Sequence, residues 1–405
     1  MRTIRPVVAA AVLFLPFLPA RVCAAEDRDV FLSSVLARGI EERAVLPGAS
    51  ARGAGEILAA VAGVEVLPVP CATPLVLLLT RPEAPLPPAL LEALSVVAAR
   101  PALNLEKSAL SHDGHSAIHY SGAPRSSGLL SIDRDRNGLP DLVDRVGEAL
   151  AASRSLLVSR LGYPAPQNDG ERLDVYLSDL GRGLEGYAVP PGEPASGSTS
   201  VGGPAASAPF IVLDAGLSGD RVMPATLHQA AHLSLLSLAA RAPRWWDEAS
   251  ASFLTLTATG DLKAHEPALR TRLQSPGRSL AADGLMLMEG GLLWPLFLAE
   301  LAGNPSVVRL VWEEMAAQGS DPLTATDQAL GKYGRSLADA HREFAAWNLF
   351  TGERDDGQHY SFGRSLPAAA LAAAGPDAPF RIEPADPIEP LGSAAFRLPG
   401  DGRRG

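Results

Sequence analysis

Two histidines four residues apart, His228 and His232, have the types and spacing best suited to chemistry in this chain. They lie in a stretch, residues 223–240, that contains no Asp, Glu, Lys or Arg. Pro224 suits a first helical turn and Pro243 follows the stretch, so the pattern predicts a helix. Residues at i and i+4 share a helix face, and the other side chains are mostly Leu, Ala and Ser, which predicts burial. A metal ion would give both buried imidazoles a partner.

A third metal ligand follows at a suitable distance. Residues 245–253 read as a second helix with Glu248 in its first turns. Two neutral histidines and one carboxylate form a catalytic type of zinc set, which leaves a fourth position for water. We expect the neighbouring Asp247 to be solvated or to support a ligand. A histidine pair alone is more often structural than metal-binding, but Glu248 favours a metal site, although retention of zinc stays open.

Gln229 stands where a base would be needed. The residues from His228 to His232 have the spacing of the zinc-protease motif H-E-x-x-H, whose glutamate accepts a proton from metal-bound water. Glutamine can hydrogen-bond that water but cannot take its proton. General-base catalysis typically contributes roughly a hundred- to ten-thousand-fold in rate. Because zinc alone lowers the pKa of bound water to about 7, weak hydrolysis is conceivable. We therefore expect little or no peptidase activity.

A second constellation, residues 133–144, fits an EF-hand type of calcium loop. Oxygen ligands fall at loop positions 1, 3, 5, 7, 9 and 12, namely Asp133, Asp135, Asn137, the backbone carbonyl of Leu139, Asp141 and Asp144. Gly138 occupies position 6, where the loop turns sharply. Because Asp144 replaces the usual glutamate, its shorter arm predicts modest affinity. An Asx-rich turn that caps the next helix explains one or two of these acidic residues but not their whole spacing.

The chain resembles a known group of proteins around both sites. The histidine motif followed by a glutamate on a second helix resembles the gluzincin metallopeptidases. The segment 245–251 (WWDEASA) is similar to the W-W-x-E-A-T-A segment of secreted bacterial metalloproteases from myxobacteria and their relatives. Further similar pieces keep the same order at residues 117–122, 161–164, 173–177 and 344–352. The resemblance covers about residues 111–365, and the departure from it is Gln229.

This resemblance implies an α+β, zincin-like fold. It has a mixed α/β N-terminal lobe that carries the metal-site helix, and a mainly helical C-terminal lobe. By resemblance, the strand before the metal helix, residues 210–213, would border the substrate cleft. Zinc proteases usually place a Tyr or His to stabilise the oxyanion, and the available side chains are Tyr333, His341, His359 and Tyr360. Of these, His341 reads as a surface helix residue.

Hydrophobic patterning predicts the remaining elements. Helices are expected at residues 28–45, 87–100, 141–161, 285–302, 305–317 and 336–350, with strands at 74–80, 173–177 and 210–214. Residues 181–209 are rich in Gly, Pro and Ser and read as a long loop, either a mobile cleft rim or a disordered insertion.

The N-terminus, residues 1–25, reads as a secretory signal peptide. We expect a secreted or periplasmic protein that does not contact the membrane after cleavage, and a lipid anchor on Cys23 is the alternative. Cys71 would then be the only cysteine, so no intrachain disulfide could form. Residues 26–110 form a possible pro-region or packing domain, 111–365 a metallopeptidase-like domain, and 366–405 a Pro/Ala/Gly-rich tail.

Three functions remain open from the sequence. The first is an inactive or impaired metallopeptidase-like protein that keeps zinc for structure or binds peptides. The second is an active zinc endopeptidase in which another carboxylate serves as base. The third is a secreted, calcium-stabilised binding module without zinc. Each implies a peptide or protein as substrate or ligand. The net charge of −10 and the lack of a Lys/Arg cluster argue against nucleic-acid binding.

Overall fold

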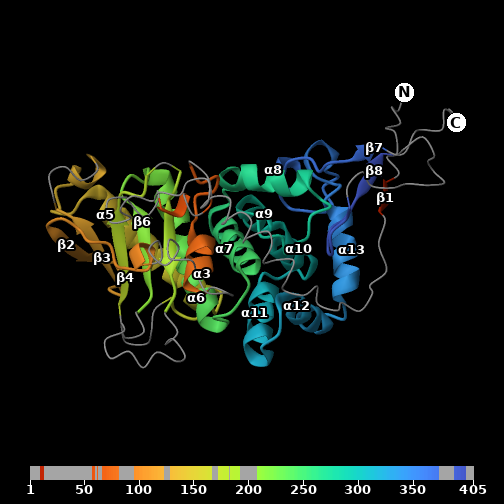
Figure 1. The fold of residues 1–405 in the computed structure, drawn as a ribbon, viewed down its shortest axis with the longest axis horizontal. Coiled ribbons are helices and arrows are strands. Elements are labelled where there is room, and N and C mark those ends of the chain that lie inside the picture. Colours follow the sequence, from red (N-terminus) through yellow and green to blue (C-terminus); the bar gives the residue numbers. More distant parts are fainter. Residues whose placement is uncertain are drawn as a thin grey trace. The chain divides into compact units, whose positions relative to one another are not determined.

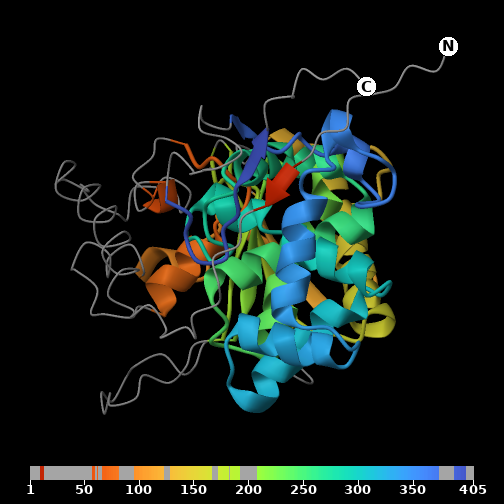
Figure 2. The same cartoon turned by 90° about the vertical axis from the view of Figure 1, so that its right-hand side faces the viewer.

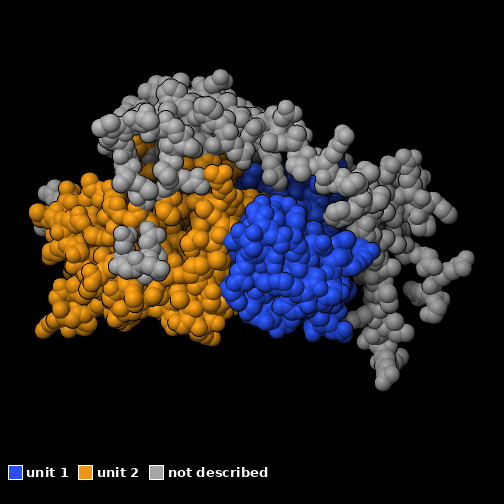
Figure 3. All heavy atoms as spheres, turned by 90° about the horizontal axis from the view of Figure 1, so that it is seen from below, with its two compact units in different colours: residues 1–19, 261–405 blue, residues 20–260 orange. Residues whose placement is uncertain are grey.

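The fold is α+β in a computed structural model of the chain (Figure 1). The structure describes residues 10–12, 57–59, 62, 66–81, 95–122, 128–166, 172–181, 183–191, 208–373 and 387–397. The chain divides into two compact units, residues 20–260 and residues 1–19 with 261–405 (Figure 3). The boundary falls within the range 111–365 that we expected as one domain. The predicted helix at 28–45 lies outside the described residues.

A five-stranded mixed sheet forms the centre of the unit of residues 20–260. Its strands are β2 (Glu106–Leu110), β3 (Ser116–Ser121), β4 (Leu173–Ser178), β5 (Gly186–Val189) and β6 (Phe210–Asp214), in the order β2-β3-β4-β6-β5. Strands β3, β4 and β6 are parallel, whereas β2 and β5 run antiparallel to their neighbours. The predicted strands at 173–177 and 210–214 are confirmed. The four apolar residues of β6 are fully buried, which suits an inner strand.

The longer α-helices among the described residues of this unit accompany the sheet. They are α3 (Thr73–Thr80), α5 (Asp141–Arg154), α6 (Gly219–Leu238) and α7 (Arg244–Thr259). Helix α5 continues into a π-helical turn, Ser155–Arg160, so the predicted helix at 141–161 is confirmed with a change of helix type near its end. Helix α6 packs against α5, α7, β5 and β6, and α3 packs against β5 and α7. The two helices predicted to carry metal ligands are therefore neighbours, and both lie next to α3 or β5.

Three sequence predictions in this unit were wrong. The stretch 74–80, predicted as a strand, is helix α3, because a short and continuously apolar run has no period that separates a buried strand from a buried helix. Helix α6 begins at Gly219, so Pro224 lies inside it rather than at its first turn. The predicted loop 181–209 contains strand β5, whose Gly-Tyr-Ala-Val sequence is buried throughout.

The other unit is mainly helical after residue 261. Its α-helices are α8 (Glu266–Gln274), α9 (Leu285–Gly290), α10 (Leu293–Leu301), α11 (Ser306–Gln318), α12 (Pro322–Gly331) and α13 (Leu337–Trp347). Short 3-10 turns lie at Leu262–His265, Gly352–Arg354 and Gly363–Ser365. The predicted helix at 285–302 is split at Gly291 and Leu292. Rings of Trp294, Phe297, Phe344 and Trp347 pack edge-to-face or stacked in its core.

A small sheet of β1 (Ala10–Val12), β8 (Ala395–Arg397) and β7 (Ala372–Ala373) belongs to the same unit (Figure 2). Strand β1 falls in the predicted signal peptide, and β7 and β8 fall in the predicted tail. Among the described helices, none alone is long and apolar enough to cross a membrane, although the bent pair Leu285–Leu301 and Ser306–Gln318 passes that test when taken together.

Candidate metal centre

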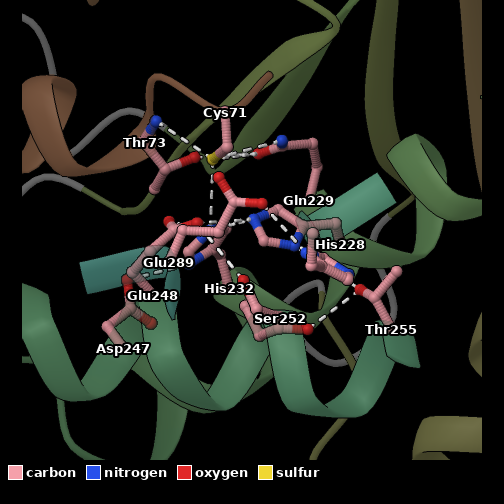
Figure 4. A network of polar contacts seen from close by, with 12 residues as sticks. Cys71, Thr73, His228, Gln229, His232, Asp247, Glu248, Ser252, Thr255 and Glu289 are labelled. Atoms are coloured by element: carbon pink, nitrogen blue, oxygen red, sulfur yellow. Dashed lines mark hydrogen bonds and ion pairs between the residues drawn. The ribbon is translucent and has the colours of Figure 1, made fainter. Parts of the chain in front are cut away.

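Helices α6 and α7 bring the three predicted zinc ligands together (Figure 4). The Nε2 atoms of His228 and His232 are 3.1 Å apart. The carboxylate of Glu248 spans both rings, with Oε1 3.3 Å from His228 Nε2 and Oε2 3.3 Å from His232 Nε2. All three side chains are buried, with exposures of 7%, 0% and 2%. Within the described part of the chain, Glu248 Oε2 receives no hydrogen bond.

Cys71 is the fourth member of the cluster, and no sequence pattern had indicated it as a ligand. Its Sγ lies 3.4 Å from His232 Nε2, and ligand atoms of Cys71, the two histidines and Glu248 all lie within 4.8 Å of one another. The segment before α3 carries this cysteine and forms a parallel bridge with Gly186 of β5. The one signal in the sequence was that Cys71 would be the only cysteine left after signal-peptide cleavage, and it did not indicate which residues the cysteine contacts.

The separations from His232 Nε2 to the other three groups are compatible with a tetrahedral zinc ion. Zn–N, Zn–O and Zn–S bonds place ligand atoms roughly 3.3–3.6 Å from one another around a tetrahedral centre. The observed separations that involve His232 Nε2 are 3.1 Å to His228, 3.3 Å to Glu248 and 3.4 Å to Cys71. Imidazole nitrogens, a carboxylate and a thiol are also the donor types that zinc prefers. The residues present therefore suit the zinc ion that the histidine motif predicts.

The outer ring nitrogens of both histidines have partners that orient them. Asp247 Oδ2 lies 2.8 Å from His232 Nδ1, and Thr255 Oγ1 lies 3.5 Å from His228 Nδ1. The Thr255 hydroxyl donates to the Ala251 carbonyl, so it is free to accept from the ring. Partners of this kind fix which ring nitrogen faces a metal. Asp247 is fully buried, so the expectation that it is solvated was wrong, whereas its contact with His232 is compatible with the alternative that it supports a metal ligand.

Gln229 is directed at Cys71 and Thr73 rather than at open solvent. Its Nε2 donates to Cys71 Sγ at 3.4 Å, and its Oε1 accepts from the Thr73 hydroxyl at 2.8 Å. The side chain is 1% exposed. Both ends of the amide are therefore engaged by the segment that carries the cysteine.

The charges in the cluster stabilise one another. Burial lowers the pKa of His228, but the neighbouring Cys71 and Glu248 outweigh it and raise that pKa to about 10. Burial also opposes the charge on His232, yet Asp247 and Cys71 raise its pKa well above the ordinary value. Burial and Glu248 raise the pKa of the Cys71 thiol, whereas the two imidazoles lower it, and the net direction is downward. The pKa of Glu248 is depressed by the imidazoles in spite of its burial. Without a metal, these four groups form an ion-pair cluster.

The predicted calcium loop has a compact arrangement of acidic side chains. Oxygens of Asp133, Asp135 and Asp141 lie within 4.8 Å of one another. The backbone N–H of Asn137 donates to Asp133 and to Asp135, each at 3.2 Å. The side-chain amide of Asn137 also contacts Asp144, which turns position 12 towards the loop.

The glycine of this loop occupies the position that the pattern requires. Gly138 has a φ of 90°, in the left-handed region that favours glycine. Its N–H donates to Asp133 Oδ2 at 3.0 Å, and the N–H of Leu139 donates to the Asn137 side chain at 2.8 Å. The sharp turn expected at position 6 is therefore present.

The four candidate oxyanion residues all lie in the unit of residues 261–405. The Tyr360 hydroxyl donates to Asn348 Oδ1 at 2.8 Å, and His359 Nδ1 lies 2.8 Å from Asp356. Tyr333 is 41% exposed. The expectation that His341 is a surface residue was wrong, since it is 8% exposed, its ring lies 6.4 Å from Trp294 and its Nε2 lies 3.1 Å from the Leu391 carbonyl.

Strand β6, which we expected to border the substrate cleft, is an inner strand of the sheet. It lies between β4 and β5, so β5 is the outer strand on the side of the cluster. The bridge between Cys71 and Gly186 places the cysteine segment along that outer strand.

The chain matches no protein-family model, and no curated protein matches it. The assignment of a function therefore depends on the residues and the geometry of the cluster.

Proposed function

We propose that this protein is a secreted, metallopeptidase-like zinc protein on a gluzincin, zincin-like scaffold, with little or no peptidase activity. The observation that carries the proposal is the buried set of His228, His232 and Glu248 beside a glutamine that cannot accept a proton. The histidines and the glutamate would hold the ion, and zinc would supply a Lewis acid and a cross-link between α6 and α7. Asp247 and Thr255 would keep the two rings oriented.

The arrangement disfavours an active enzyme with a substitute base. Glu248 faces the two histidines as a ligand, and Asp247 contacts the outer nitrogen of His232, opposite the nitrogen that faces the cluster. Neither carboxylate is therefore placed to take a proton from a water at the fourth position. Cleavage of peptides by this protein would need a base from elsewhere in the chain.

Zinc content and peptidase activity test this proposal together. We expect about one zinc per chain in the purified protein by elemental mass spectrometry, as a single such site requires. His228→Ala should lose the zinc, whereas His115→Ala, which changes an exposed histidine outside the cluster, should keep it. A folded protein without zinc would favour the calcium-stabilised binding module. Rapid, chelator-sensitive cleavage of casein by the unaltered protein would establish an active enzyme instead.

We further propose that the 133–144 loop binds calcium and stabilises the secreted protein. Three carboxylates that converge beside Gly138 support this assignment. Removal of a signal peptide would leave at most one cysteine, so no intrachain disulfide could stabilise the fold. Bound calcium can stabilise an extracellular protein in place of disulfides. The partner class remains a peptide or protein ligand, since the acidic chain does not suit nucleic acid.

A further inference from the structure

We propose that Cys71 is the fourth zinc ligand, so that the centre is a closed His-His-Glu-Cys site, and that Gln229 is the residue matched to the cysteine thiolate. The inference rests on the proposed zinc site, and it changes the nature of that site. A catalytic zinc keeps an open position for water, whereas a structural zinc has four protein ligands. Cys71 Sγ lies 3.4 Å from His232 Nε2 and within 4.8 Å of ligand atoms of His228 and Glu248, close enough for the four groups to share one ion.

The main chain around Cys71 is held on the outer edge of β5. The Pro70 carbonyl accepts from the N–H groups of Glu185 and Gly186, at 2.8 and 3.4 Å, and the Ala72 N–H donates to the Gly186 carbonyl at 3.2 Å. Backbone hydrogen bonds on both sides of Cys71 therefore position its sulfur. These bonds also occupy polar groups on the strand edge that an added peptide would use.

Gly186 makes this close packing sterically possible. A Cβ at this position would lie 2.8 Å from the Val212 carbonyl oxygen and 3.3 Å from Gln229 Cγ. A side chain here would push β5 away from β6 or from the glutamine. The strand can therefore approach both the metal-site helix and the cysteine segment only with glycine at this point.

The surroundings of the sulfur suit a thiolate. The Thr73 backbone N–H donates to Sγ at 3.4 Å, and Gln229 Nε2 donates to it at the same distance. The sulfur also lies just before the first turn of α3, whose N-terminal end favours negative charge. Two N–H donors and a helix N-terminus point at one buried sulfur, which is what a metal-bound thiolate requires.

Gln229 is better suited to this sulfur than a glutamate would be. The Thr73 hydroxyl donates to Gln229 Oε1, and the NH₂ end is the nearer to Cys71 Sγ, at 3.4 Å against 3.9 Å for Oε1. A glutamate would instead place a carboxylate beside the thiolate and near Glu248. The absence of a proton acceptor at position 229 and the presence of a sulfur ligand at Cys71 therefore suit each other, because the amide can donate to the thiolate and a carboxylate cannot.

The charges of the zinc ion and its four direct ligands balance. Zinc carries two positive charges, and the Glu248 carboxylate and the Cys71 thiolate carry one negative charge each, while both histidines are neutral. As the zinc–nitrogen and zinc–sulfur bonds form, the protons that the two imidazoles and the thiol share in the metal-free cluster leave to solvent, and no electron is transferred. A neutral centre can be buried at much lower cost than a charged one. A glutamate at position 229 would add an uncompensated negative charge.

Cobalt substitution tests the sulfur ligand directly. The full chain carries Cys23→Ser, so that Cys71 is its only thiol, and is loaded with Co²⁺ in place of zinc. We expect a thiolate-to-cobalt charge-transfer band in the near ultraviolet. Cys71→Ser should abolish that band while Co²⁺ remains bound by the other three ligands. The loss of zinc affinity should exceed the ~10- to 100-fold that follows removal of an outer hydrogen-bond partner.

The outcomes separate this inference from the proposed function. One metal per chain without the charge-transfer band overturns the sulfur ligand and leaves the three-ligand zinc site standing. A folded chain that binds neither zinc nor cobalt overturns both. The spectrum of the protein that retains Cys71 decides the question even where the Cys71→Ser variant does not fold.

Discussion

The side-chain amide of Gln229 donates a hydrogen bond to the sulfur of Cys71, a residue 158 positions earlier in the chain, at 3.4 Å. This contact joins the residue that departs from the protease motif to the residue that would close the metal site. A protein with both features has no open zinc position and no base, so restoring only one of them should not restore chemistry.

Activity should return only when both positions are changed. We expect Gln229→Glu alone to stay inactive, because Cys71 still fills the fourth position. Cys71→Ala together with Gln229→Glu should cleave casein or a fluorogenic peptide faster than Cys71→Ala alone, by roughly the hundredfold or more that a general base supplies. Equal rates in the double variant and in Cys71→Ala would mean that the glutamate does not reach the metal-bound water.

The same two positions should be coupled in stability. In the zinc-loaded protein, Gln229→Glu places a carboxylate beside the thiolate, so it should lower the free energy of unfolding more when Cys71 is present than in Cys71→Ala. Residues in direct contact typically show coupling energies of about 0.5–3 kcal/mol. Denaturant unfolding of the unaltered protein, the two single variants and the double variant measures this coupling energy. Additive effects would show that the two side chains do not interact in solution.

Asp247→Asn should weaken zinc binding without removing a ligand. Asp247 Oδ2 holds the Nδ1 side of His232 at 2.8 Å, and loss of such a partner typically costs about 10- to 100-fold in metal affinity. Competition with a chelator of known affinity measures the change. The control is Asp220→Asn, an exposed position in the first turn of α6, which should leave the affinity unaltered. Unchanged affinity in Asp247→Asn would argue against zinc at this cluster.

Calcium should stabilise the protein through the 133–144 loop. We expect the melting temperature to rise with millimolar calcium, because a ligand that binds only the folded state at a hundred times its Kd adds about 2.7 kcal/mol. Asp133→Ala should abolish the rise. Asp144→Glu should enlarge it, since the longer side chain can give the bidentate contact usual at position 12. Titration calorimetry that detects no calcium-dependent heat in the unaltered protein would refute the assignment.

His341 should make the protein less stable in mild acid. Burial lowers its pKa below the ordinary value in spite of the Leu391 carbonyl, so the unfolded chain binds this proton more readily than the folded one. Its contribution to stability should therefore be present above the ordinary pKa of about 6.5 and decline as the pH falls towards the folded value. The pH dependence of the melting temperature over this window should be shallower in His341→Gln. An identical slope in both proteins would exclude His341 as its source.

The local parts of the site were accessible from the sequence. His228 and His232 are one helical turn apart, and Glu248 follows after a short loop, so periodicity and spacing alone place all three on neighbouring helices. The strands β4 and β6 were also evident, since their apolar runs are short, β-branched in part and bounded by turn residues.

The contribution of Cys71 could not be read from the sequence. It reaches the histidines through a backbone bridge to β5, and β5 itself was hidden in a Gly/Pro-rich stretch that reads as a loop. Helix α3 was mistaken for a strand because its residues are apolar on nearly every side. Long-range contacts of this kind depend on pairing geometry that no local pattern encodes.

The bridge between the cysteine segment and β5 has a consequence for any peptide that binds this protein. A guest strand that uses this edge must displace a segment of the same chain, whose effective concentration at the strand is set by its tether and is commonly millimolar. Free peptides would compete poorly with this tethered segment for the edge of β5. Tight binding of a peptide there would require release or cleavage of the segment that carries Cys71. The segment around Cys71 therefore blocks the edge of β5 to peptides that would add to the sheet.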